Sequence, residues 1–414
     1  MQIAVVGSGI AGLASAWLLA REHEVTLFEA NDYLGGHTHT HDVEVGGRRY
    51  AVDTGFIVFN PPHYPFLHKL FGELDVASQP TTMSFAVKNE RSGLEYNATD
   101  LAGLFCRRRN LVSPRFWRML ADLKRFYREA PALLDDQDAG PTLGEYLDEH
   151  RYSHAFADDH LLPMASALWS SPSSQIMKFP AKYLVQFMAN HQMLQMRDRP
   201  QWRVVKGGSQ TYVRALRKNW RVRERIGCAA TRVTRDVDGV TVQNPAGSER
   251  YDHVVLACHS DQALAVLGDA GVQEREILGA MRYQDNDTVL HTDADLLPRR
   301  RRAWAAWNAI VPRADTQACT VSYCMNLLQS LDCAEPIVVT LNRTAQIAPQ
   351  KILRRLRYQH PVYTRASVAA QKRKAEIQGV NRTWFAGAYW GWGFHEDGMR
   401  SAVDVANGLG VRWS

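Results

Sequence analysis

The chain has 414 residues, of which 45% are hydrophobic and 22% charged, and its formal net charge is +6. This length exceeds the roughly 250–300 residues at which one core stops growing, so we expect two domains. Ordinary Gly and Pro usage and 10% aromatic residues exclude a disordered or low-complexity chain. The positive charge gathers in two arginine runs, residues 107–109 and 299–302. Neither run lies in a module with stacking aromatics, so we expect no nucleic-acid partner.

The six cysteines include no C-x-x-C pair, and their spacing fits neither a zinc site nor a disulfide framework. We expect free thiols, a reducing compartment and no metal. The first residues show no leader pattern, and no uncharged apolar run approaches the roughly 20 residues of a membrane span. These features predict a cytoplasmic protein. The arginine runs add the expectation of peripheral contact with anionic lipid at the inner face of the membrane.

In chain order, the first elements predicted are a strand at residues 1–6, a tight turn, a helix at 13–21 and a strand at 24–29. This βαβ unit requires a parallel sheet. Two later apolar runs, residues 251–257 and 383–386, resemble buried strands of the same sheet. The domain that contains this sheet is therefore expected to be discontinuous in sequence.

The intervening chain predicts a second, mixed domain. Helical spacing occurs at residues 114–134, 143–149 and 181–196, and extended segments are predicted at 287–292, 303–310, 320–327 and 337–341. The predicted fold is α/β, with a doubly wound, Rossmann-like domain and an inserted α+β substrate domain. The first comprises residues 1–75, 205–260 and 378–414, and the second comprises residues 76–204 and 261–377.

The strongest local motif is G-x-G-x-x-G, formed by Gly7, Gly9 and Gly12 between the first strand and the helix. Gly7 permits the sharp turn, Gly9 lets the backbone approach a pyrophosphate, and Gly12 lets helix and strand pack closely. Glu29, at the end of the second strand, is placed to accept hydrogen bonds from ribose hydroxyls. The motif therefore predicts a bound dinucleotide.

Residues 29–37, Glu-Ala-Asn-Asp-Tyr-Leu-Gly-Gly-His, resemble the flavin-containing amine oxidase and protoporphyrinogen oxidase superfamily. In that superfamily an acidic residue is followed by a loop and a Gly-Gly pair beside the flavin diphosphate. Residues 52–56, 205–209, 384–388 and 398–402 resemble further superfamily segments. The resemblance implies FAD as the cofactor. It implies FAD contacts at Gly7, Gly9, Ile10, Ala11, Gly12, Glu29, Ala30, Gly35, Gly36, His37, Thr54, Gly55, Phe56, Val233, Gly387, Gly398 and Met399.

Three of these contacts have specific expected roles. Gly398 is expected to open a helix at residues 399–409, with the backbone N–H of Met399 near the pyrimidine edge of the flavin. A helix N-terminus there stabilises the negative charge that develops on reduction. By analogy with the superfamily, the backbone of Val233 is expected at the adenine.

A narrower resemblance is to bacterial FAD-binding proteins that are described only as predicted oxidoreductases and are often encoded beside cyclopropane-fatty-acid-type lipid methyltransferases. Matching segments extend over nearly the whole chain, and the most specific is Gly-Phe-His-Glu-Asp-Gly at residues 393–398. This resemblance implies a hydrophobic acyl-lipid substrate and a lipid methyltransferase as a partner.

Two departures from amine oxidases concern the substrate side of the flavin. Amine oxidases commonly hold a lysine on the strand that corresponds to residues 283–295, and no lysine occurs there. The second is Gly398, which stands where an aromatic cage residue usually precedes the methionine. A further departure lies at the cofactor, where Ala388 replaces an acidic contact to the ribityl chain or the pyrophosphate. These departures disfavour amine oxidation.

The candidate catalytic groups are His395, Glu396 and His291, with His37 and His360 as further polar candidates, since an imidazole titrates near neutral pH. Asp397 is expected to cap the nearby helix. A set of aromatic residues is expected to line an apolar substrate channel. These residues are Trp169, Trp202, Trp304, Trp307, Tyr323, Trp390 and Trp392.

The sequence thus predicts an FAD-dependent oxidoreductase that removes two electrons from a hydrophobic acyl lipid, with desaturation as one form of the reaction. Three alternatives stay open: a flavin amine oxidase, a flavin-binding partner that presents lipid to a methyltransferase, and a non-redox isomerase. The electron acceptor, the oligomeric state and covalent attachment of the flavin are not determined by the sequence.

Overall fold

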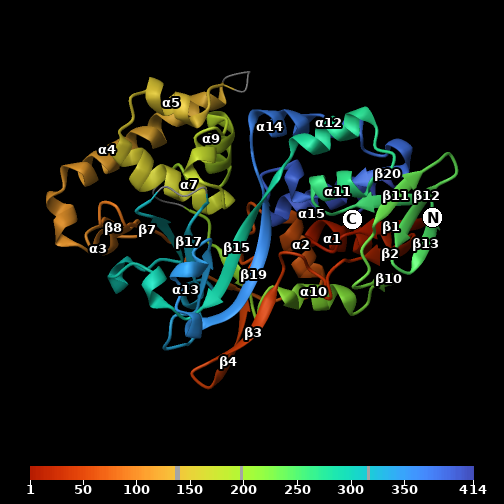
Figure 1. Ribbon diagram of the computed structural model, residues 1–414, viewed down its shortest axis with the longest axis horizontal. Helices are drawn as coiled ribbons and strands as arrows, with labels where there is room; N and C mark the ends of the chain where they lie inside the picture. The colour runs from red at the N-terminus through yellow and green to blue at the C-terminus, as the bar shows by residue number, and fades with distance from the viewer. Residues whose placement is uncertain (136–139, 196–198, 315–317) are drawn as a thin grey trace.

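The computed structural model describes residues 1–135, 140–195, 199–314 and 318–414. Figure 1 shows an elongated molecule with two lobes along its longest axis. The lobe at the N-terminus contains the parallel sheet. The other lobe contains a second, larger sheet and most of the helices of the first half of the chain.

A five-stranded parallel sheet with the order β10-β2-β1-β14-β20 forms the centre of the first lobe. Its strands are β1 (Gln2–Val6), β2 (Glu24–Phe28), β10 (Val222–Arg225), β14 (His253–Leu256) and β20 (Thr383–Phe385). In β1, Ile3 and Val5 face one side while Ala4 and Val6 face the other, and all four are buried. Because both faces of the sheet are covered, β1 is a continuous apolar run without alternation.

Helices cover one face of this sheet, and a small antiparallel sheet with two helices covers the other. The first layer consists of α1 (Ile10–Leu19), α2 (Pro65–Glu73), α10 (Gln210–Arg217) and α15 (His395–Gly408). The second consists of β11 (Arg232–Arg235), β12 (Val240–Asn244), β13 (Gly247–Tyr251), α11 (Ser260–Val266) and α12 (Val272–Ala280). The α/β fold class is confirmed, with an antiparallel sheet in place of part of one helical layer.

The second lobe is built on a seven-stranded mixed sheet with the order β19-β15-β18-β17-β16-β7-β8. The strands are β7 (Phe85–Asn89), β8 (Glu95–Asn97), β15 (Tyr283–His291), β16 (Trp307–Val311), β17 (Val321–Cys324), β18 (Val338–Leu341) and β19 (Ile352–Pro361). The sheet is mixed: β16 and β7 pair in parallel, whereas all other neighbouring strands of the sheet pair antiparallel.

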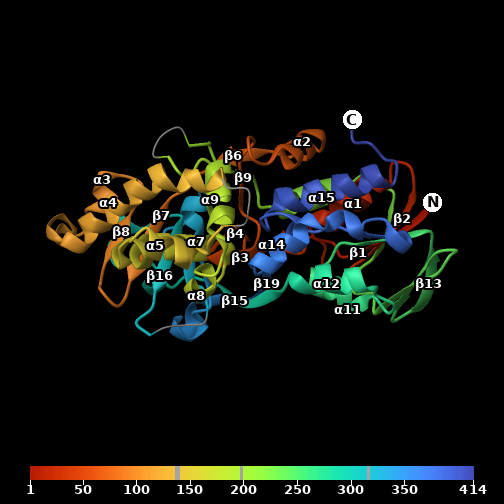
Figure 2. The ribbon, with the colours of Figure 1, turned by 90° about the horizontal axis from the view of Figure 1, so that it is seen from above.

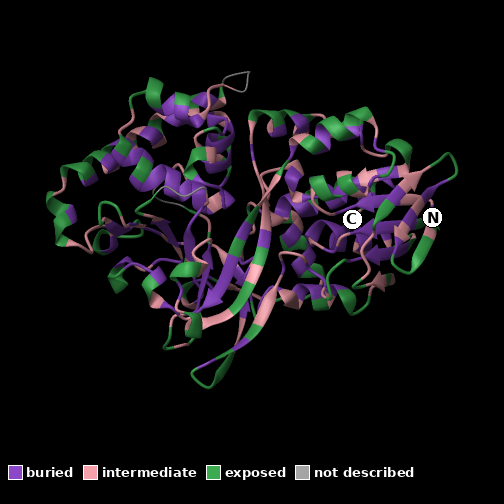
Figure 3. Cartoon of the chain, in the orientation of Figure 1, coloured by how far each residue is buried: buried purple, intermediate pink, exposed green. Residues whose placement is uncertain are grey.

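A helical layer packs beside this sheet and buries its own apolar cluster (Figure 2). It contains α3 (Leu101–Leu104), α4 (Pro114–Glu129), α5 (Leu143–Glu149), α6 (His154–Phe156), α7 (Leu162–Trp169), α8 (Ser173–Ile176) and α9 (Ala181–Asn190). Figure 3 shows buried residues at the centre of both lobes and exposed ones on the outer helices. Among the described residues, no helix combines the length and apolar content needed to cross a membrane.

The long pair β15 and β19 runs between the two lobes (Figure 1). Two small sheets also lie between the two lobes. One is a hairpin of β3 (Thr40–Val45) and β4 (Arg48–Asp53), and the other consists of β5 (Val58–Phe59), β6 (Ser78–Pro80) and β9 (Arg203–Val205). The remaining helices are α13 (Met325–Leu328) and α14 (Arg365–Lys372). The buried Asp53 accepts hydrogen bonds from Thr40 Oγ1 and from the Ser209 backbone, and so fixes the hairpin to α10.

Most predicted elements are present, with shifted ends. The helix expected at residues 399–409 begins at His395. The carboxylate of Asp397 accepts hydrogen bonds from the backbone N–H groups of Trp392 and Phe394, both at 3.0 Å, and so caps this first turn as expected. The helix predicted at 181–196 ends at Asn190, and residue 196 lies outside the described residues. The strand β19 was not predicted, because an edge strand buries little and lacks an apolar pattern.

Candidate active site

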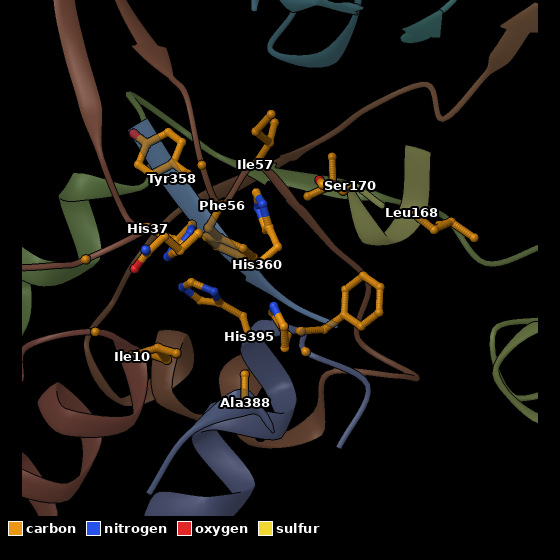
Figure 4. Close-up of a pocket in the computed structure, with 18 of the residues that line it drawn as sticks. Ile10, His37, Phe56, Ile57, Leu168, Ser170, Tyr358, His360, Ala388 and His395 are labelled. Atoms are coloured by element: carbon orange, nitrogen blue, oxygen red, sulfur yellow. The ribbon is translucent and has the colours of Figure 1, made fainter. Parts of the chain in front are cut away.

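One cavity of about 1420 Å³ connects the glycine turn of the first lobe with the apolar interior of the second (Figure 4). Small-molecule pockets are typically about 300–1,000 Å³. The cavity is therefore large enough for a dinucleotide together with a second ligand. Its lining residues come from both lobes and from the β15 and β19 pair between them.

The glycine turn has the geometry of a phosphate cradle. Gly7 has a φ of +99°, which favours glycine, and a Cβ on Gly12 would lie 1.9 Å from the carbonyl oxygen of Gly7. A Cβ on Gly9 would meet nothing within 4 Å, so the cavity side of the turn is open at this residue. The N-terminus of α1 follows at Ile10, with no acidic residue in its first turn. Free N–H groups and the helix dipole favour an anion here.

Glu29 lies at the carboxyl end of β2 and is almost fully buried, yet it lines the cavity. Its carboxylate accepts hydrogen bonds from the backbone N–H of Ser8 at 2.9 Å and from the backbone and side chain of Asn31, both at 2.8 Å. These bonds hold the carboxylate beside the glycine turn. Ser8 Oγ also donates to it at 2.5 Å, so the carboxylate is fully hydrogen-bonded within the chain, beside the space where a ribose adjoining the pyrophosphate would lie.

His395 lies in the first turn of α15 and lines the cavity (Figure 4). Its ring stacks on Phe56 with centroids 3.7 Å apart, and its Nε2 lies 3.0 Å from Thr38 Oγ1 and 3.1 Å from the Tyr212 hydroxyl. Burial, with the neighbouring His37 as a smaller cause, lowers the pKa of His395 well below its usual value. The imidazole is therefore neutral at physiological pH.

A group of histidines surrounds His37, whose ring centroid lies 5.3 Å from that of His360 and 6.3 Å from that of His259. Burial first, and then the neighbouring imidazole, lowers the pKa of His37 to about 4 and that of His360 to about 3. His37 Nε2 is buried and has no hydrogen-bond partner among the described residues. Nowhere among the residues that the structure describes do three or more His, Cys, Asp or Glu side chains form a group that could hold a metal ion. The His37 ring therefore offers an unused polar atom to a ligand of the cavity.

Many of the other expected cofactor contacts also line this cavity. They are Gly7, Gly9, Ile10, Ala11, Ala30, Gly36, Thr54, Gly55, Phe56 and Gly387. Gly12, Gly35 and Gly398 are not among the lining residues; they allow close packing instead. A Cβ on Gly398 would lie 2.7 Å from Ile10 Cγ2, and one on Gly35 would lie 2.4 Å from the Thr38 carbonyl oxygen.

Met399 and Val233 do not line the cavity either. Met399 is fully buried in the core between α15 and the parallel sheet, because α15 starts four residues earlier than expected. Val233 is buried in β11, and Ala229 and Ala230, just before that strand, line the cavity in its place. The backbone contacts with the flavin that the sequence predicts at these two residues stay predictions.

Glu396 and His291 lie away from the cavity, so the structure does not support the catalytic roles expected for them. Glu396 accepts hydrogen bonds from the backbone N–H groups of Phe66 and Leu67, at 2.9 and 3.0 Å, at the start of α2. His291 is buried within the large sheet, with its Nε2 2.7 Å from Thr340 Oγ1 and its Nδ1 accepting from the Asp293 backbone. Both residues stabilise local structure.

Of the aromatic residues expected in a channel, Trp202, Trp307 and Tyr323 line the cavity. The others, Trp169, Trp304, Trp390 and Trp392, do not. From β15 and β19, the sequence analysis named His360 but missed four other residues that line the cavity, namely Tyr283, Asp285, Arg357 and Tyr358. Asp285 of β15 and Arg357 of β19 form an ion pair diagonally across the two strands. β19 was not predicted as a strand, because its exposed, arginine-rich sequence lacks an apolar pattern.

FAD fits the residues present. The open side of Gly9 and the N-terminus of α1 suit the pyrophosphate, and the Glu29 carboxylate suits the ribose. Beyond them, the unpartnered His37 Nε2 and the stacked His395 lie along the same cavity. The parallel sheet, the glycine turn and the two-lobed cavity define a flavoprotein of the oxidoreductase class. The chain belongs to the family of flavin-containing amine oxidoreductases, whose model matches residues 10–289.

Comparison with individual proteins supports the same fold. The cyclohexylamine oxidase of Brevibacterium oxydans superposes with a TM-score of 0.69 at 17% identity, over 99% of each chain. The fatty acid isomerase of P. acnes that produces CLA superposes with a TM-score of 0.67 at 16% identity, over 98% of each chain. In sequence, 74 residues are 43% identical to the 1-hydroxycarotenoid 3,4-desaturase of a Flavobacterium species. That match covers 17% of this chain and only 14% of the desaturase.

Proposed function

We propose that the protein uses FAD to remove two electrons from the acyl chain of a hydrophobic lipid, for example by desaturation. The apolar wall of the cavity in the second lobe carries this proposal. That wall is formed by Leu123, Tyr127, Met164, Leu168, Phe187, Met193, Trp307 and Tyr323. Burial of apolar area is worth about 25 cal/mol per Å², so a long hydrocarbon chain gains more from such a wall than a small polar substrate does.

The charges around the cavity disfavour an amine. Glu29 and Asp285 are the only acidic residues that line it within the described chain, and no lysine does. Glu29 is held by Ser8 and Asn31, and Asp285 pairs with Arg357. A protonated amine entering the apolar part would therefore lose its hydration without gaining an anionic partner. A neutral acyl chain has no such cost.

The residues at the junction of the two lobes suit an uncharged reactant. His37, His360 and His395 are held neutral by burial, so they add hydrogen-bonding atoms and no charge. FAD, when bound, would accept the two electrons as one hydride. The chain's own contribution is to bind and orient the hydrocarbon, exclude water, and offer His37 Nε2 and the His395 group as polar contacts.

The names of two similar proteins support a long apolar substrate, since one is a carotenoid desaturase and the other a fatty acid isomerase. The cyclohexylamine oxidase supports the alternative, oxidation of an amine. The first relative matches over a short segment and the other two at low identity. The proposal therefore rests mainly on the cavity wall.

The test is anaerobic reduction of the purified, FAD-loaded protein. Phospholipids with methylated or cyclopropane-modified acyl chains are expected to bleach the visible flavin band and yield a product lighter by two hydrogens. Bleaching by polyamines or aromatic amines, with peroxide formed in air, would instead establish an amine oxidase. A flavin that no lipid reduces, together with tight binding of a lipid methyltransferase, would favour the lipid-presenting role. A product of unchanged mass that forms only after prior flavin reduction would identify an isomerase.

A further inference from the structure

Exposed apolar side chains concentrate in one short stretch of the second lobe. Within residues 101–117, Leu101 is 73% exposed, Val112 79%, and Leu111 and Trp117 50% each. They lie on α3, on the turn after it and on the first turn of α4. Figures 1 and 2 both place α3 at the end of the long axis opposite the N-terminus. A contiguous group of large apolar side chains on a surface marks an interaction site.

The two arginine runs, far apart in sequence, meet at this stretch. Arg299 donates its backbone N–H to the Glu95 carboxylate of β8 at 3.1 Å, and Asn97 of β8 donates to the Trp304 carbonyl oxygen at 2.9 Å. Burial raises the pKa of Cys106, and both Arg107 and Arg300 oppose that rise through their charge. Residues 107–109 and 299–302 are therefore brought together beside β8 as one basic cluster, and residues 107–109 adjoin the exposed apolar residues in sequence.

These arginines differ from their neighbours in lacking counter-charges. Arg115 pairs with Asp159 at 2.6 Å and Arg118 pairs with Asp122 at 3.3 Å. None of the seven guanidinium groups of the two runs lies within 4.0 Å of a carboxylate in the described part of the chain. Asp100, the acidic residue closest in sequence to residues 107–109, caps α3 by accepting a hydrogen bond from the Gly103 N–H. The cluster is thus available to an anionic partner.

We propose that this face, formed by residues 101–117 and 299–302, docks on the surface of an anionic phospholipid bilayer. Leucine, valine and tryptophan side chains that project beside arginines match the boundary between acyl chains and phosphate headgroups. Each arginine near a negative leaflet adds to the attraction, and the attraction is weakened by salt. A nucleic acid would satisfy the arginines but would leave Leu111 and Val112 without an apolar partner.

The position of the cavity agrees with this docking mode. Ala98 and Thr99, which lie between β8 and the N-cap of α3, line the cavity, as do Leu123 and Tyr127 of α4. The apolar wall of the cavity therefore belongs to the same structural unit as the docking face. The inference deepens the proposed function, because an acyl substrate would come from the bilayer, yet binding itself requires no turnover.

The test is sedimentation of the full-length, FAD-loaded protein with vesicles. We expect binding to vesicles of phosphatidylcholine and phosphatidylglycerol in equal parts, weak binding to phosphatidylcholine alone, and loss of binding at high salt. The combined variant Arg108→Ala, Arg109→Ala, Arg300→Ala, Arg301→Ala should bind at least about tenfold more weakly. The variant Leu111→Ser, Val112→Ser should also bind more weakly and should lose the salt-resistant part of the binding.

Two matched controls keep the test specific. Arg354→Ala, Arg355→Ala removes exposed arginines from β19, and Val272→Ser removes an exposed apolar side chain from the first lobe. Both should bind vesicles like the wild type. All replaced side chains are exposed, so thermal unfolding should change little and would reveal a folding defect if one occurred.

Unchanged vesicle binding of the arginine or the apolar variant would overturn the proposal, as would equal binding to the neutral and the anionic vesicles. Binding of a DNA duplex that depends on the arginines, with no vesicle binding, would replace the bilayer by a nucleic acid. Vesicle binding without lipid oxidation would leave the docking face valid and would reject the proposed function. Lipid oxidation in detergent without vesicle binding would support the proposed function and would reject the docking face.

Discussion

The imidazole of His395 lies flat on the ring of Phe56, with the two centroids 3.7 Å apart and 10° between the ring planes. Phe56 comes from the segment after β4, and His395 comes from the first turn of α15. The stack fixes the imidazole so that its Nε2 reaches both Thr38 and Tyr212. One aromatic contact thus orients the polar group that the structure places between the glycine turn and the substrate cavity.

His395→Phe should retain the stack on Phe56 and remove the hydrogen bonds of Nε2. We expect the variant to fold and bind FAD, with kcat reduced by about 10²-fold, because a positioned polar group at the reacting centre typically contributes this much. Burial keeps His395 neutral, so the wild-type pH profile should lack a step near the usual histidine pKa from this residue. Turnover measured across pH checks both points. An unchanged kcat, or a step near neutral pH that the variant loses, would contradict this assignment.

Glu396→Gln tests whether this residue is structural. Burial raises the pKa of Glu396 from 4.5 to about 7, although the N–H groups of Phe66 and Leu67 oppose the rise. The folded state therefore holds the proton more tightly than the unfolded chain does. The protonated carboxyl of Glu396 therefore stabilises the folded state. This stabilisation is complete below pH 4.5, declines as the pH rises, and is lost above about pH 7.

Glutamine cannot ionise, so the free energy of unfolding of Glu396→Gln should improve relative to wild type as pH rises through this window, by up to about 3 kcal/mol. Urea unfolding at a series of pH values measures the difference. Activity per folded molecule should remain within about twofold of wild type, since the carboxylate lies outside the cavity. A large loss of kcat in a stable variant would return Glu396 to the catalytic candidates.

Gly9→Ala and Gly12→Ala form a matched pair in the glycine turn. A Cβ on Gly9 meets no protein atom within 4 Å, so this variant should fold with near wild-type stability but bind FAD at least about tenfold more weakly, since the methyl group enters the phosphate cradle. A Cβ on Gly12 would lie 1.9 Å from a backbone oxygen, so that variant should lose thermal stability as well. Flavin absorbance and thermal unfolding distinguish the two effects. Tight FAD binding by Gly9→Ala would place the pyrophosphate elsewhere.

Leu168→Trp tests the apolar part of the cavity, which Leu168 lines in Figure 4. The larger side chain should shorten the space for hydrocarbon, so KM should rise severalfold for long acyl chains and little for short ones. Leu168→Met preserves the side-chain volume and serves as the control. Kinetics over a series of chain lengths measures the effect. An equal rise in KM for every length would show that the chain does not extend past Leu168.

The local part of this protein could be predicted from its sequence. The strand β1, the glycine turn, α1, β2 and Glu29 form one continuous unit of about 30 residues, and its motif depends on backbone geometry that neighbouring residues determine. The same holds for α5, which helical spacing predicted with the observed ends and which the structure shows to be capped locally by Thr142 and Glu145. The family and the cofactor follow from such segments.

Only the tertiary structure decided which distant side chains share the cavity. His291 and Glu396 have residue types suited to catalysis, but long-range packing commits them to Thr340 and to the start of α2. The same packing places β19 beside β15 and brings the two arginine runs together at β8. A sequence pattern reports the burial and backbone preference of each segment, whereas these contacts depend on how the segments dock. The sequence alone thus determined the dinucleotide unit, and the packing of the two lobes determined the cavity and its polar groups.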